Sequence, residues 1–469
     1  MLRFGCIADD FTGASDAASF LVKGGMSVQL FNGIPSGDTV AAVNTDAVVI
    51  ALKSRTQETK AAVKDSLEAV KWLKERGARQ FYFKYCSTFD STREGNIGPV
   101  ADAVMEYLKV PYTILCPALP VNGRVVKEGR LYVNGVPLNE SPMKDHPLTP
   151  MWESSIAKLI EPQSKYPSVE LWGDELGISR DELSEKLLSK LSESSKESGK
   201  DSSHFYVIPD YRDDADARDI VRLFGDLGFI TGGSGILEEL ASHLSKGETA
   251  GKMPESSTPG RGILLAGSCS KATLGQIAYF MEHGGAAKKI SPEKLISGEE
   301  SIEDIWSFVE KNPDRDVLVY SSDTPENVKK IQSLGQERIA GLLEDTEAEI
   351  AKRALKAGIK RIIVAGGETS GAVTKKLGFS SYIIGDSVAP GVPVMVPVED
   401  KSVRLVLKSG NFGQPDFFER ALKLTAADEE LKKKKETAIW IAKSLFDRNR
   451  TTGSSANLSF VHEGKVYIT

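Results

Sequence analysis

The sequence contains few residues of the kinds that build disulfide frameworks or zinc sites. Among its 469 residues there are 4 cysteines and 5 histidines, with no CxxC pair and no HExxH motif. The cysteines lie far apart, beside apolar or small residues, at Cys6, Cys86, Cys116 and Cys269. A disulfide scaffold, a zinc knuckle and a histidine-built metal site are therefore excluded, and four free thiols in a reducing compartment are expected.

The sequence also lacks long apolar runs and an excess of positive charge. No segment approaches the roughly 18 consecutive apolar residues of a membrane span, and the N-terminus MLRFGCIADD has no signal-peptide pattern. The 59 lysines and arginines against 65 aspartates and glutamates give a net charge of −6, which excludes the broad positive field of a nucleic-acid-binding surface. We therefore expect a cytoplasmic protein with neither nucleic acid nor membrane as a partner.

Apolar runs alternate with helical patterns along the first half of the chain, which predicts βαβ units and a parallel sheet. The strands expected are 2–8, 47–52, 80–84, 112–116 and 204–209, and the helices expected are 14–24, 60–77 and 99–108. The Ser/Lys-rich tract 187–203 cannot bury a core, so it is interpreted as a solvated helix end and a loop.

A segment rich in Gly, Pro, Ser and charge, residues 245–261, predicts a domain boundary. A second α/β pattern follows it, with strands expected at 262–266, 317–320, 361–365, 381–384 and 404–407. The sequence therefore predicts two α/β domains, 1–244 and 262–426, with mainly parallel sheets flanked by helices. The cleft between two such domains is the usual place for the chemistry of a two-substrate enzyme.

Two adjacent carboxylates, Asp9 and Asp10 in the motif ADDFTGA, follow the first predicted strand. Ligands of open α/β sheets bind at the carboxyl ends of strands. A carboxylate there can accept a proton from a hydroxyl, bind a sugar hydroxyl or ligate Mg²⁺. The alternative is helix capping, but two acids exceed what one cap requires.

Hydroxyl-rich loops follow the next two strands. The segment KYCSTFDSTREGNIGP begins at Lys84 and combines hydroxyls, an amide, two glycines and charges of both signs, a set suited to gripping a small polyhydroxylated anion. Within it, Ser91, Thr92, Arg93 and Asn96 are the candidate contacts. Arg55, in Ser-Arg-Thr after the second strand, is either a surface ion pair or a clamp for a carboxylate.

Three Gly-rich turns, AGSCS, AGGETSG and KSGNFG, each follow a predicted strand of the second domain. Glycines let a phosphate approach the backbone, and N–H groups at a helix start carry partial positive charge. One such turn is weak support, because strand-to-helix turns often use glycine for positive φ. Three in one domain favour a phosphate site, although neither GxxxxGK[ST] nor GxGxxG occurs.

Together these segments resemble the four-carbon acid sugar kinases. The motifs ADDFTGA, YFKYCSTFDST with GNIGP, CPALPVNGR, LNESPMKDHPLTPM, TGGSG, AGSCS, AGGETSG and LKSGNFG occur in this order across residues 1 to about 424. They are most similar to the 3-oxo-tetronate kinase branch. The resemblance implies a sugar-acid-binding domain, 1–244, a nucleotide-binding domain, 262–426, and transfer of a phosphoryl group from ATP to the C4 hydroxyl of a 3-dehydro-tetronate.

The resemblance also implies roles for individual residues. Those implied to face the sugar acid are Asp9, Asp10, Arg55, Lys84, Asp90, Ser91, Thr92 and Asn96, and those implied to contact ATP are Ser268, Gly366, Gly367, Glu368, Thr369 and Gly410. Our hypothesis is that Asp10 orients or deprotonates the C4 hydroxyl, while Mg²⁺ and backbone amides neutralise developing charge. No Mg²⁺ ligands are assigned. Relatives of this kind are often dimers, so a homodimer is one expectation.

Residues 427–469 depart from the kinase pattern. The run TGSSANLS resembles the opening of the class II aldolase/adducin family, which includes a decarboxylase that acts on the product of this kinase. This implies a kinase fused or coupled to such a decarboxylase, of which only an incomplete segment is present. The alternative is an ordinary amphipathic helix followed by a hairpin.

Two alternatives to a 3-oxo-tetronate kinase stay open at this point. The first is a D-threonate or D-erythronate kinase, because specificity rests on one or two contacts to C3. The second is a non-catalytic sugar-acid sensor of the same fold, against which the three Gly-rich turns argue.

Overall fold

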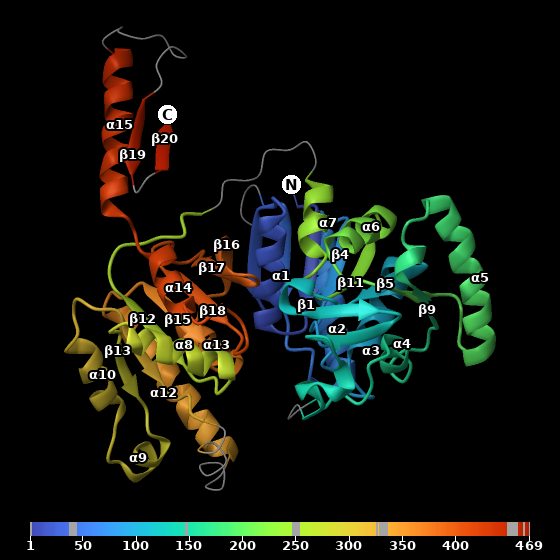
Figure 1. Cartoon of the computed structure of the whole chain (residues 1–469), viewed down its shortest axis with the longest axis horizontal. Helices are drawn as coiled ribbons and strands as arrows, with labels where there is room; N and C mark the ends of the chain where they lie inside the picture. The colour runs from blue at the N-terminus through green and yellow to red at the C-terminus, as the bar shows by residue number, and fades with distance from the viewer. Residues whose placement is uncertain are drawn as a thin grey trace.

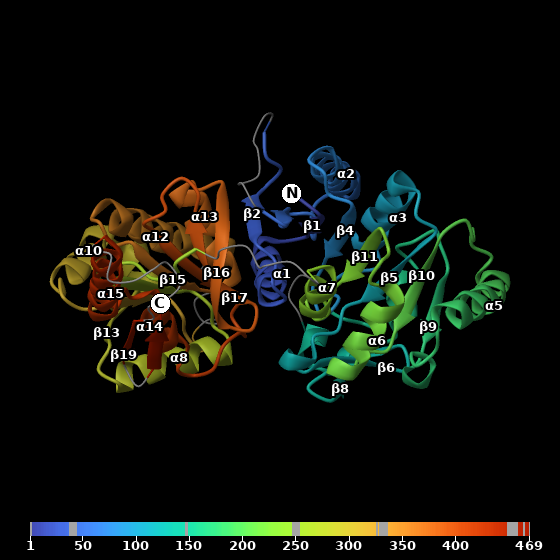
Figure 2. The same ribbon diagram turned by 90° about the horizontal axis from the view of Figure 1, so that it is seen from above.

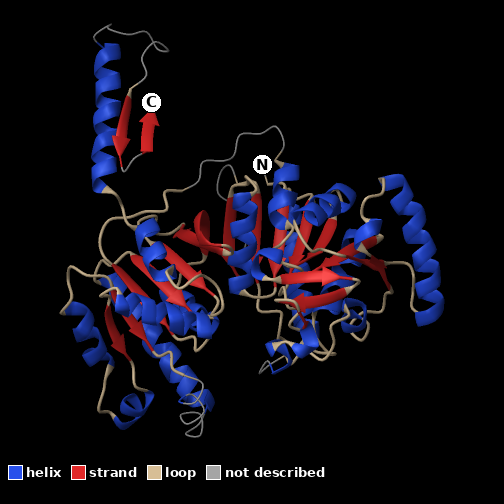
Figure 3. Cartoon of the chain, viewed as in Figure 1, coloured by secondary structure: helices blue, strands red, loops and turns tan. Residues whose placement is uncertain are grey.

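The computed structural model describes residues 2–36, 45–145, 149–245, 254–324, 327, 336–447, 458–462 and 465–468. Figure 1 shows two lobes side by side, an N-terminal lobe coloured blue to green and a C-terminal lobe coloured yellow to red. Each lobe has buried strands with helices against them (Figure 3). Within the described ranges, no helix is both long and apolar enough to cross a membrane.

The N-terminal lobe is built on parallel strands, as the alternating pattern predicts. Every neighbouring pair of its main sheet is parallel. In spatial order the strands are β2 (Val28–Asn32), β3 (Ala47–Ala51), β1 (Phe4–Ala8), β4 (Gln80–Lys84), β11 (Phe229–Gly232), β5 (Tyr112–Cys116), β10 (Phe205–Pro209) and β9 (Ser168–Leu171). The five strands predicted for this half are confirmed, whereas β2, β9 and β11 were not predicted as strands.

The helices of this lobe lie on both sides of the sheet (Figure 2). They are α1 (Phe11–Lys23), α2 (Thr59–Glu75), α3 (Ile97–Leu108), α4 (Ile156–Ile160), α5 (Arg180–Ser198), α6 (Asp214–Phe224) and α7 (Leu237–Leu244). A small antiparallel sheet comprises β6 (Arg124–Lys127), β7 (Arg130–Val133) and β8 (Val136–Pro137). Helix α5 covers much of the Ser/Lys-rich tract and ends at its Gly199 C-cap, which confirms the interpretation as a solvated helix end.

The C-terminal lobe has the same parallel plan, followed by an antiparallel extension. Its parallel strands are β13 (Ala286–Lys289), β14 (Val317–Tyr320), β12 (Gly262–Ala266), β15 (Arg361–Ala365) and β18 (Arg404–Lys408). Strands β17 (Val392–Pro397) and β16 (Ser381–Ala389) continue the sheet in antiparallel pairing. The helices are α8 (Lys271–Glu282), α9 (Pro292–Ser297), α10 (Ile302–Glu310), α12 (Gln336–Lys356), α13 (Gly367–Leu377) and α14 (Phe417–Thr425). The predicted class, two mainly parallel α/β domains, is thereby confirmed.

The two sheets join edge to edge, which the sequence did not predict. Strand β16 pairs antiparallel with β2, with Tyr382 opposite Leu30, so that fifteen strands of the described residues form one continuous sheet. The ring of Phe11 packs edge-on against that of Tyr382, their centroids 5.9 Å apart, and helix α1 lies beside β16 and β17 (Figures 1 and 2). The lobes are therefore held together by backbone hydrogen bonds as well as by side-chain packing.

The described part of the predicted linker, from residue 254 on, packs on the C-terminal lobe. The Ser256 hydroxyl donates to Asp386 Oδ2 at 2.9 Å, and the Thr258 N–H donates to the Thr425 carbonyl at 2.9 Å. Residues 246–253 lie outside the described residues.

The C-terminal segment stands away from both lobes (Figure 1). It forms helix α15 (Glu429–Asp447) and the hairpin of β19 (Ser459–His462) and β20 (Lys465–Ile468). Residues 448–457, which carry most of TGSSANLS, lie outside the described residues.

Candidate functional site

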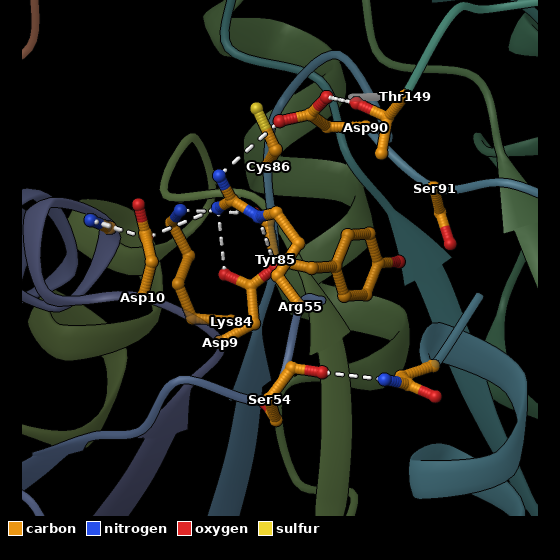
Figure 4. A network of polar contacts seen from close by, with 12 residues as sticks. Asp9, Asp10, Ser54, Arg55, Lys84, Tyr85, Cys86, Asp90, Ser91 and Thr149 are labelled. Atoms are coloured by element: carbon orange, nitrogen blue, oxygen red, sulfur yellow. Dashed lines mark hydrogen bonds and ion pairs between the residues drawn. The ribbon is translucent and has the colours of Figure 1, made fainter. Parts of the chain in front are cut away.

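The predicted sugar-acid residues gather where three parallel strands end. Strands β3, β1 and β4 are neighbours, so the segments after them meet at one edge of the sheet. Figure 4 shows the result: Asp9 and Asp10 after β1, Arg55 after β3, and Lys84 with its following loop at the end of β4 point toward one another. This proximity follows from the parallel topology.

Arg55 is the centre of this cluster. Its Nε and Nη2 atoms donate to the two oxygens of Asp9 at 2.8 and 2.9 Å, Nη2 lies 3.1 Å from Asp10 Oδ1, and Nη1 lies 3.3 Å from Asp90 Oδ2. A planar guanidinium suits this forked geometry. In this structure Arg55 therefore binds three carboxylates of the protein itself and fixes the β1 and β4 loops relative to each other.

Asp10 performs the capping role that was the alternative reading of ADDFTGA. Its oxygens accept hydrogen bonds from the Gly13 N–H at 2.8 Å and the Thr12 hydroxyl at 2.7 Å, which start helix α1. Burial acts to raise the pKa of Asp10, but Arg55, Lys84 and these hydrogen bonds outweigh it and hold the pKa below its ordinary value. Asp10 is therefore a well-fixed anion and a weak proton acceptor.

Lys84 is buried at the end of β4 and connects the cluster to a fourth carboxylate. Its Nζ donates to the Tyr85 carbonyl at 3.0 Å and lies 3.7 Å from Asp16 Oδ2 on helix α1. The same Asp16 oxygen accepts a hydrogen bond from the Ser234 hydroxyl at 2.6 Å, in the TGGSG turn. Sequence analysis did not single out Asp16, although a carboxylate among the alanines of a buried helix face was a usable signal.

The STFDST loop is held in an unusual conformation. Phe89 and Asp90 both have positive φ, 63° and 51°, which costs energy for residues other than glycine and is often found at functional sites. Asp90 stays there because one of its oxygens accepts from Thr149, of the HPLTPM motif, while the other faces Arg55. Two motifs far apart in sequence thus form one structure.

Three other residues of this loop, Ser91, Thr92 and Asn96, take part in hydrogen bonds within the protein. Gln163 Nε2 donates to Ser91 Oγ at 3.1 Å and to the Thr92 carbonyl at 2.7 Å. The amide of Asn96 donates to the carbonyls of Ser54 and Gln57 at 2.7 and 2.8 Å, so it braces the loop after β3. A small pocket is lined by Asp9, Ser54, Arg55, Phe83, Asp90, Ser91, Asn96 and Ile97.

Arg124, in the CPALPVNGR motif, is a second residue that sequence analysis did not select. Its Nη1 donates to the Asn122 carbonyl, whereas its buried Nε has no partner among the described residues. Its charge interacts with Asp16 and Cys86. Arg55 is occupied by protein carboxylates, whereas Arg124 has a guanidinium nitrogen without a partner among the described residues and acts through its charge on Asp16 and Cys86 beside this site. Arg93, by contrast, stacks 3.7 Å over the ring of Trp152.

The three Gly-rich turns of the C-terminal lobe also converge, because β12, β15 and β18 are neighbours. The Gly410 carbonyl accepts hydrogen bonds from Ser270, Thr273 and Lys408 at 2.5, 3.0 and 3.0 Å. A Cβ atom on Gly410 would lie 2.2 Å from Ser268 Oγ. Glycine is therefore required here for the close approach of two turns.

The AGGETSG turn presents a helix N-terminus. Gly366 is the N-cap of α13, with φ 142° and no side-chain capping bond, and Gly367 and Glu368 after it are exposed. The first N–H groups of a helix lack intrahelical partners and carry partial positive charge, which suits a phosphate. Thr369 is buried beside Gly366, so the predicted ATP contacts Ser268, Gly366, Gly367, Glu368, Thr369 and Gly410 occur together in space.

Two buried ionisable groups adjoin these turns and were not predicted. Lys408 is almost fully buried, and desolvation lowers its pKa to about 7. Glu347 of α12 accepts from the Ser321 N–H at 3.2 Å. Burial raises the pKa of Glu347 to about 7, although hydrogen bonds from Ser321 and Thr369 oppose the shift.

We expect Glu347→Gln to remove part of the pH dependence of stability. The pKa of Glu347 is about 7 in the folded protein and near 4.3 in the unfolded chain. Between these pH values Glu347 is therefore protonated in the folded protein and ionised in the unfolded chain. The stability contributed by the protonated form is thus present below pH 4 and lost as pH rises to 7, by up to about 4 kcal/mol. Denaturant unfolding at pH 5 and pH 8 should show a smaller difference for the variant than for the wild type. The control is Glu349→Gln on the same helix, which should leave this difference as it is in the wild type. If the unfolding free energy changes equally between pH 5 and pH 8 in the wild type and in Glu347→Gln, the prediction is contradicted.

The described residues contain no group of three or more His, Cys, Asp or Glu side chains arranged to hold a metal ion. The Asp9, Asp10 and Asp90 carboxylates surround a guanidinium instead.

Comparison with known families matches both lobes. Residues 4–240 match the model of a sugar-binding N-terminal domain, and residues 263–418 match the model of a nucleotide-binding C-terminal domain.

Curated relatives and solved structures match most of the chain. The chain is 41% identical to a 3-oxo-tetronate kinase of Pseudomonas savastanoi pv. phaseolicola, over 90% of this chain and 97% of the relative, and 42% identical to one of Cupriavidus necator, over 89% and 96%. The crystal structure of Haemophilus influenzae protein HI1011 superposes with a TM-score of 0.72 at 39% identity, over 89% of this chain and 98% of that one. A structure from Salmonella typhimurium LT2 gives a TM-score of 0.79 at 37% identity, over 90% and 99%.

Proposed function

Because the chain belongs to the family that joins this sugar-binding N-terminal domain to this nucleotide-binding C-terminal domain, we propose that it is an ATP-dependent sugar-acid kinase. Its substrate is 3-oxo-tetronate, the acid for which its curated relatives are named, and its product is the 4-phosphate. The observation that carries the proposal is the pairing of two sites in one chain: three convergent Gly-rich turns in one lobe and a fixed acidic and cationic cluster in the other.

The N-terminal cluster supports binding of a small hydroxylated acid. Arg55 holds both carboxylates in place, by hydrogen bonds to Asp9 and an ion pair with Asp10. Their oxygens accept hydrogen bonds from sugar hydroxyls, and Asp10 orients the C4 hydroxyl. Lys84 and Arg124 supply positive charge for the carboxylate, and Asp90, Ser91, Thr92 and Asn96 shape the loop around it. Binding through several fixed groups holds the reacting hydroxyl in place, which is a large part of catalysis in phosphoryl transfer.

The C-terminal turns support binding of the ATP phosphates. Ser268 and the backbone N–H groups at Gly367 and Glu368 face the position that the phosphates would occupy, and Gly366 and Gly410 allow the phosphates to approach the backbone. Donors fixed before the reaction stabilise the charge that develops on the transferred group.

Mg²⁺ would enter the nucleotide-binding site together with ATP, bound to the phosphates. Mg²⁺ in kinases is commonly held by substrate phosphates with one or two carboxylates, and the described residues offer no larger carboxylate cage. When bound, it would neutralise charge on the phosphates.

The segment after residue 427 supports a further part of the proposal. Ile439, Trp440, Val461 and Val466 are exposed by 52 to 65%, which favours packing against another surface. We propose that it corresponds to the start of a class II aldolase-like domain, as its sequence resemblance implies. Cytoplasmic location and a homodimer stay predictions.

The function is tested by coupling ADP formation to a spectroscopic readout, with ATP, Mg²⁺ and each of three acids. We expect turnover with 3-oxo-tetronate and little with D-threonate or D-erythronate. Faster turnover with D-threonate or D-erythronate would contradict the substrate assignment but would still support a kinase. Absence of turnover with all three acids, from a folded protein that binds ATP, would contradict the kinase and favour a sensor.

A further inference from the structure

Asp16 is a buried carboxylate whose second oxygen lacks a donor. Oδ2 accepts from Ser234 and faces Lys84, as described above. Oδ1 is inaccessible to solvent and has no hydrogen-bond partner within the described ranges of the chain. Buried polar atoms are nearly always paired in native proteins, so an unpaired acceptor here indicates a place for a donor from a ligand.

Asp16 lies where the two lobes meet. The turn between β16 and β17 belongs to the C-terminal lobe, and a Cβ atom on its Gly391 would lie 2.2 Å from Asp16 Oδ1 and 3.0 Å from the ring of Phe412. Phe412 belongs to KSGNFG, the turn that carries Gly410. One turn further along α1, the hydroxyls of Ser19 and Ser387 are 2.9 Å apart. Oδ1 is thus directed at the nucleotide-binding lobe, beside one of its phosphate-binding turns.

A phosphoryl transfer between the two sites must take place at this junction. The proposed sites hold the sugar hydroxyl in the N-terminal lobe and the γ-phosphoryl in the C-terminal lobe. Asp16 is a buried carboxylate that lies against both lobes, at Ser234 of TGGSG and at Gly391 of the turn between β16 and β17. Gly391 packs directly over Oδ1, and a side chain at this position would clash with the carboxylate.

We propose that Asp16 is the proton acceptor of the reaction, an inference that rests on the proposed kinase function. The O–H bond of the C4 hydroxyl breaks and its proton passes to Asp16 Oδ1. The hydroxyl oxygen forms a bond to the γ-phosphorus, while the bond from that phosphorus to the β–γ bridging oxygen breaks and its electron pair leaves with ADP. Asp10 keeps its role of orienting the substrate.

The surroundings of the two carboxylates separate their roles. Asp10 is held ionised by Arg55, Thr12 and Gly13, which makes it a weak base. Burial raises the pKa of Asp16, with Lys84 and Ser234 opposing and the Asp10 charge adding to the shift. Arg124 also acts on Asp16 through its charge. Gly391, which adjoins Oδ1 from the C-terminal lobe, and Phe412 beside Gly391 are uncharged. A general base is most effective when its pKa is raised toward the working pH.

The first test is Asp16→Asn in the full chain. We expect kcat to fall by about 10²- to 10⁴-fold, the usual contribution of a general base, with KM for ATP and for the sugar acid within about threefold of the wild type. The matched control is Asp102→Asn, another buried carboxylate of the same lobe, which accepts from Ser164 at 2.8 Å and from Tyr206. It should keep kcat within about threefold. An Asp16→Asn enzyme that keeps a tenth or more of wild-type kcat would overturn the inference.

The second test separates chemistry from structure and does not need Asp16→Asn to fold. Ser234→Ala removes a hydrogen bond that stabilises the ionised form of Asp16, so the pKa of Asp16 should rise and the acid limb of kcat/KM should move to higher pH. A purely structural Asp16 would leave that limb in place, and an unmoved limb would overturn the inference. Failure of the kinase function itself is distinguished because the wild type would then be inactive with all three acids.

Discussion

Arg55→Met is expected to destabilise the N-terminal lobe by about 3–5 kcal/mol at pH 7, the usual cost of removing one partner from a buried ion pair. Asp9 and Asp90 are buried, and the variant leaves them and Asp10 with no guanidinium. Each would have to protonate or draw in water. Kinase activity should also be lost, because the β1 and β4 loops are no longer fixed to each other.

The measurement is guanidinium-induced unfolding followed by circular dichroism, at pH 7 and again at about pH 3, below the ordinary aspartate pKa of about 3.9. Asp10 has a pKa lowered by Arg55 and Lys84, so the stability that it contributes is present above its unfolded pKa and is lost as pH falls through its folded pKa. The difference between variant and wild type should therefore shrink at the lower pH.

Two variants serve as controls. Arg55→Lys keeps the positive charge but not the forked donor geometry of the guanidinium, so it should recover part of the lost stability. Arg93→Met removes an arginine of the neighbouring loop that stacks on Trp152, and it should reduce the stability by less than about 1 kcal/mol. A stability for Arg55→Met within about 1 kcal/mol of the wild type would show that the cluster is not held by this guanidinium.

The second large effect is expected for ATP binding in Gly366→Ala. Gly366 has φ 142°, which an L-residue rarely adopts, and a Cβ there would lie 3.0 Å from Thr369 Oγ1 and 3.1 Å from the Ser268 N–H. Forcing such a conformation costs on the order of 1–3 kcal/mol, which corresponds to about a 5- to 150-fold weaker ATP affinity if the turn shifts to relieve it. Binding of the sugar acid should not change, because its site is in the other lobe.

The matched control is Gly371→Ala in the same motif. Gly371 is inside helix α13, and no atom lies within 4 Å of the position of an added Cβ. Alanine should be neutral or slightly stabilising at a helix interior. Titration calorimetry with ATP would measure both variants, and an affinity of Gly366→Ala within about threefold of the wild type would mean that the turn does not touch the phosphates.

The sequence by itself determined ten of the buried strands and the sets of residues at their ends, but not β2, β9, β11, β13 and β17. Strands such as Gln80–Lys84 and Tyr112–Cys116 were predicted to the residue, because fully buried strands bounded by helices have an unambiguous apolar pattern. In a parallel sheet, segments that follow neighbouring strands meet at one edge, so motif spacing was enough to group Asp9, Arg55 and Lys84, and likewise Ser268, Gly366 and Gly410.

Only the tertiary structure decided how these groups are used. Motif chemistry could not tell that Arg55 would bind protein carboxylates or that Asp10 would be occupied as a helix cap, because both depend on distances across three loops. The same holds for Asp16. The environment of Asp16 is formed by Ser234 and Gly391, which are more than 200 residues away in sequence. This environment forms because β2 and β16 pair and join the two sheets. No local pattern encodes that pairing: it arises from the packing of two lobe edges, and it places a buried carboxylate at the junction between the two sites.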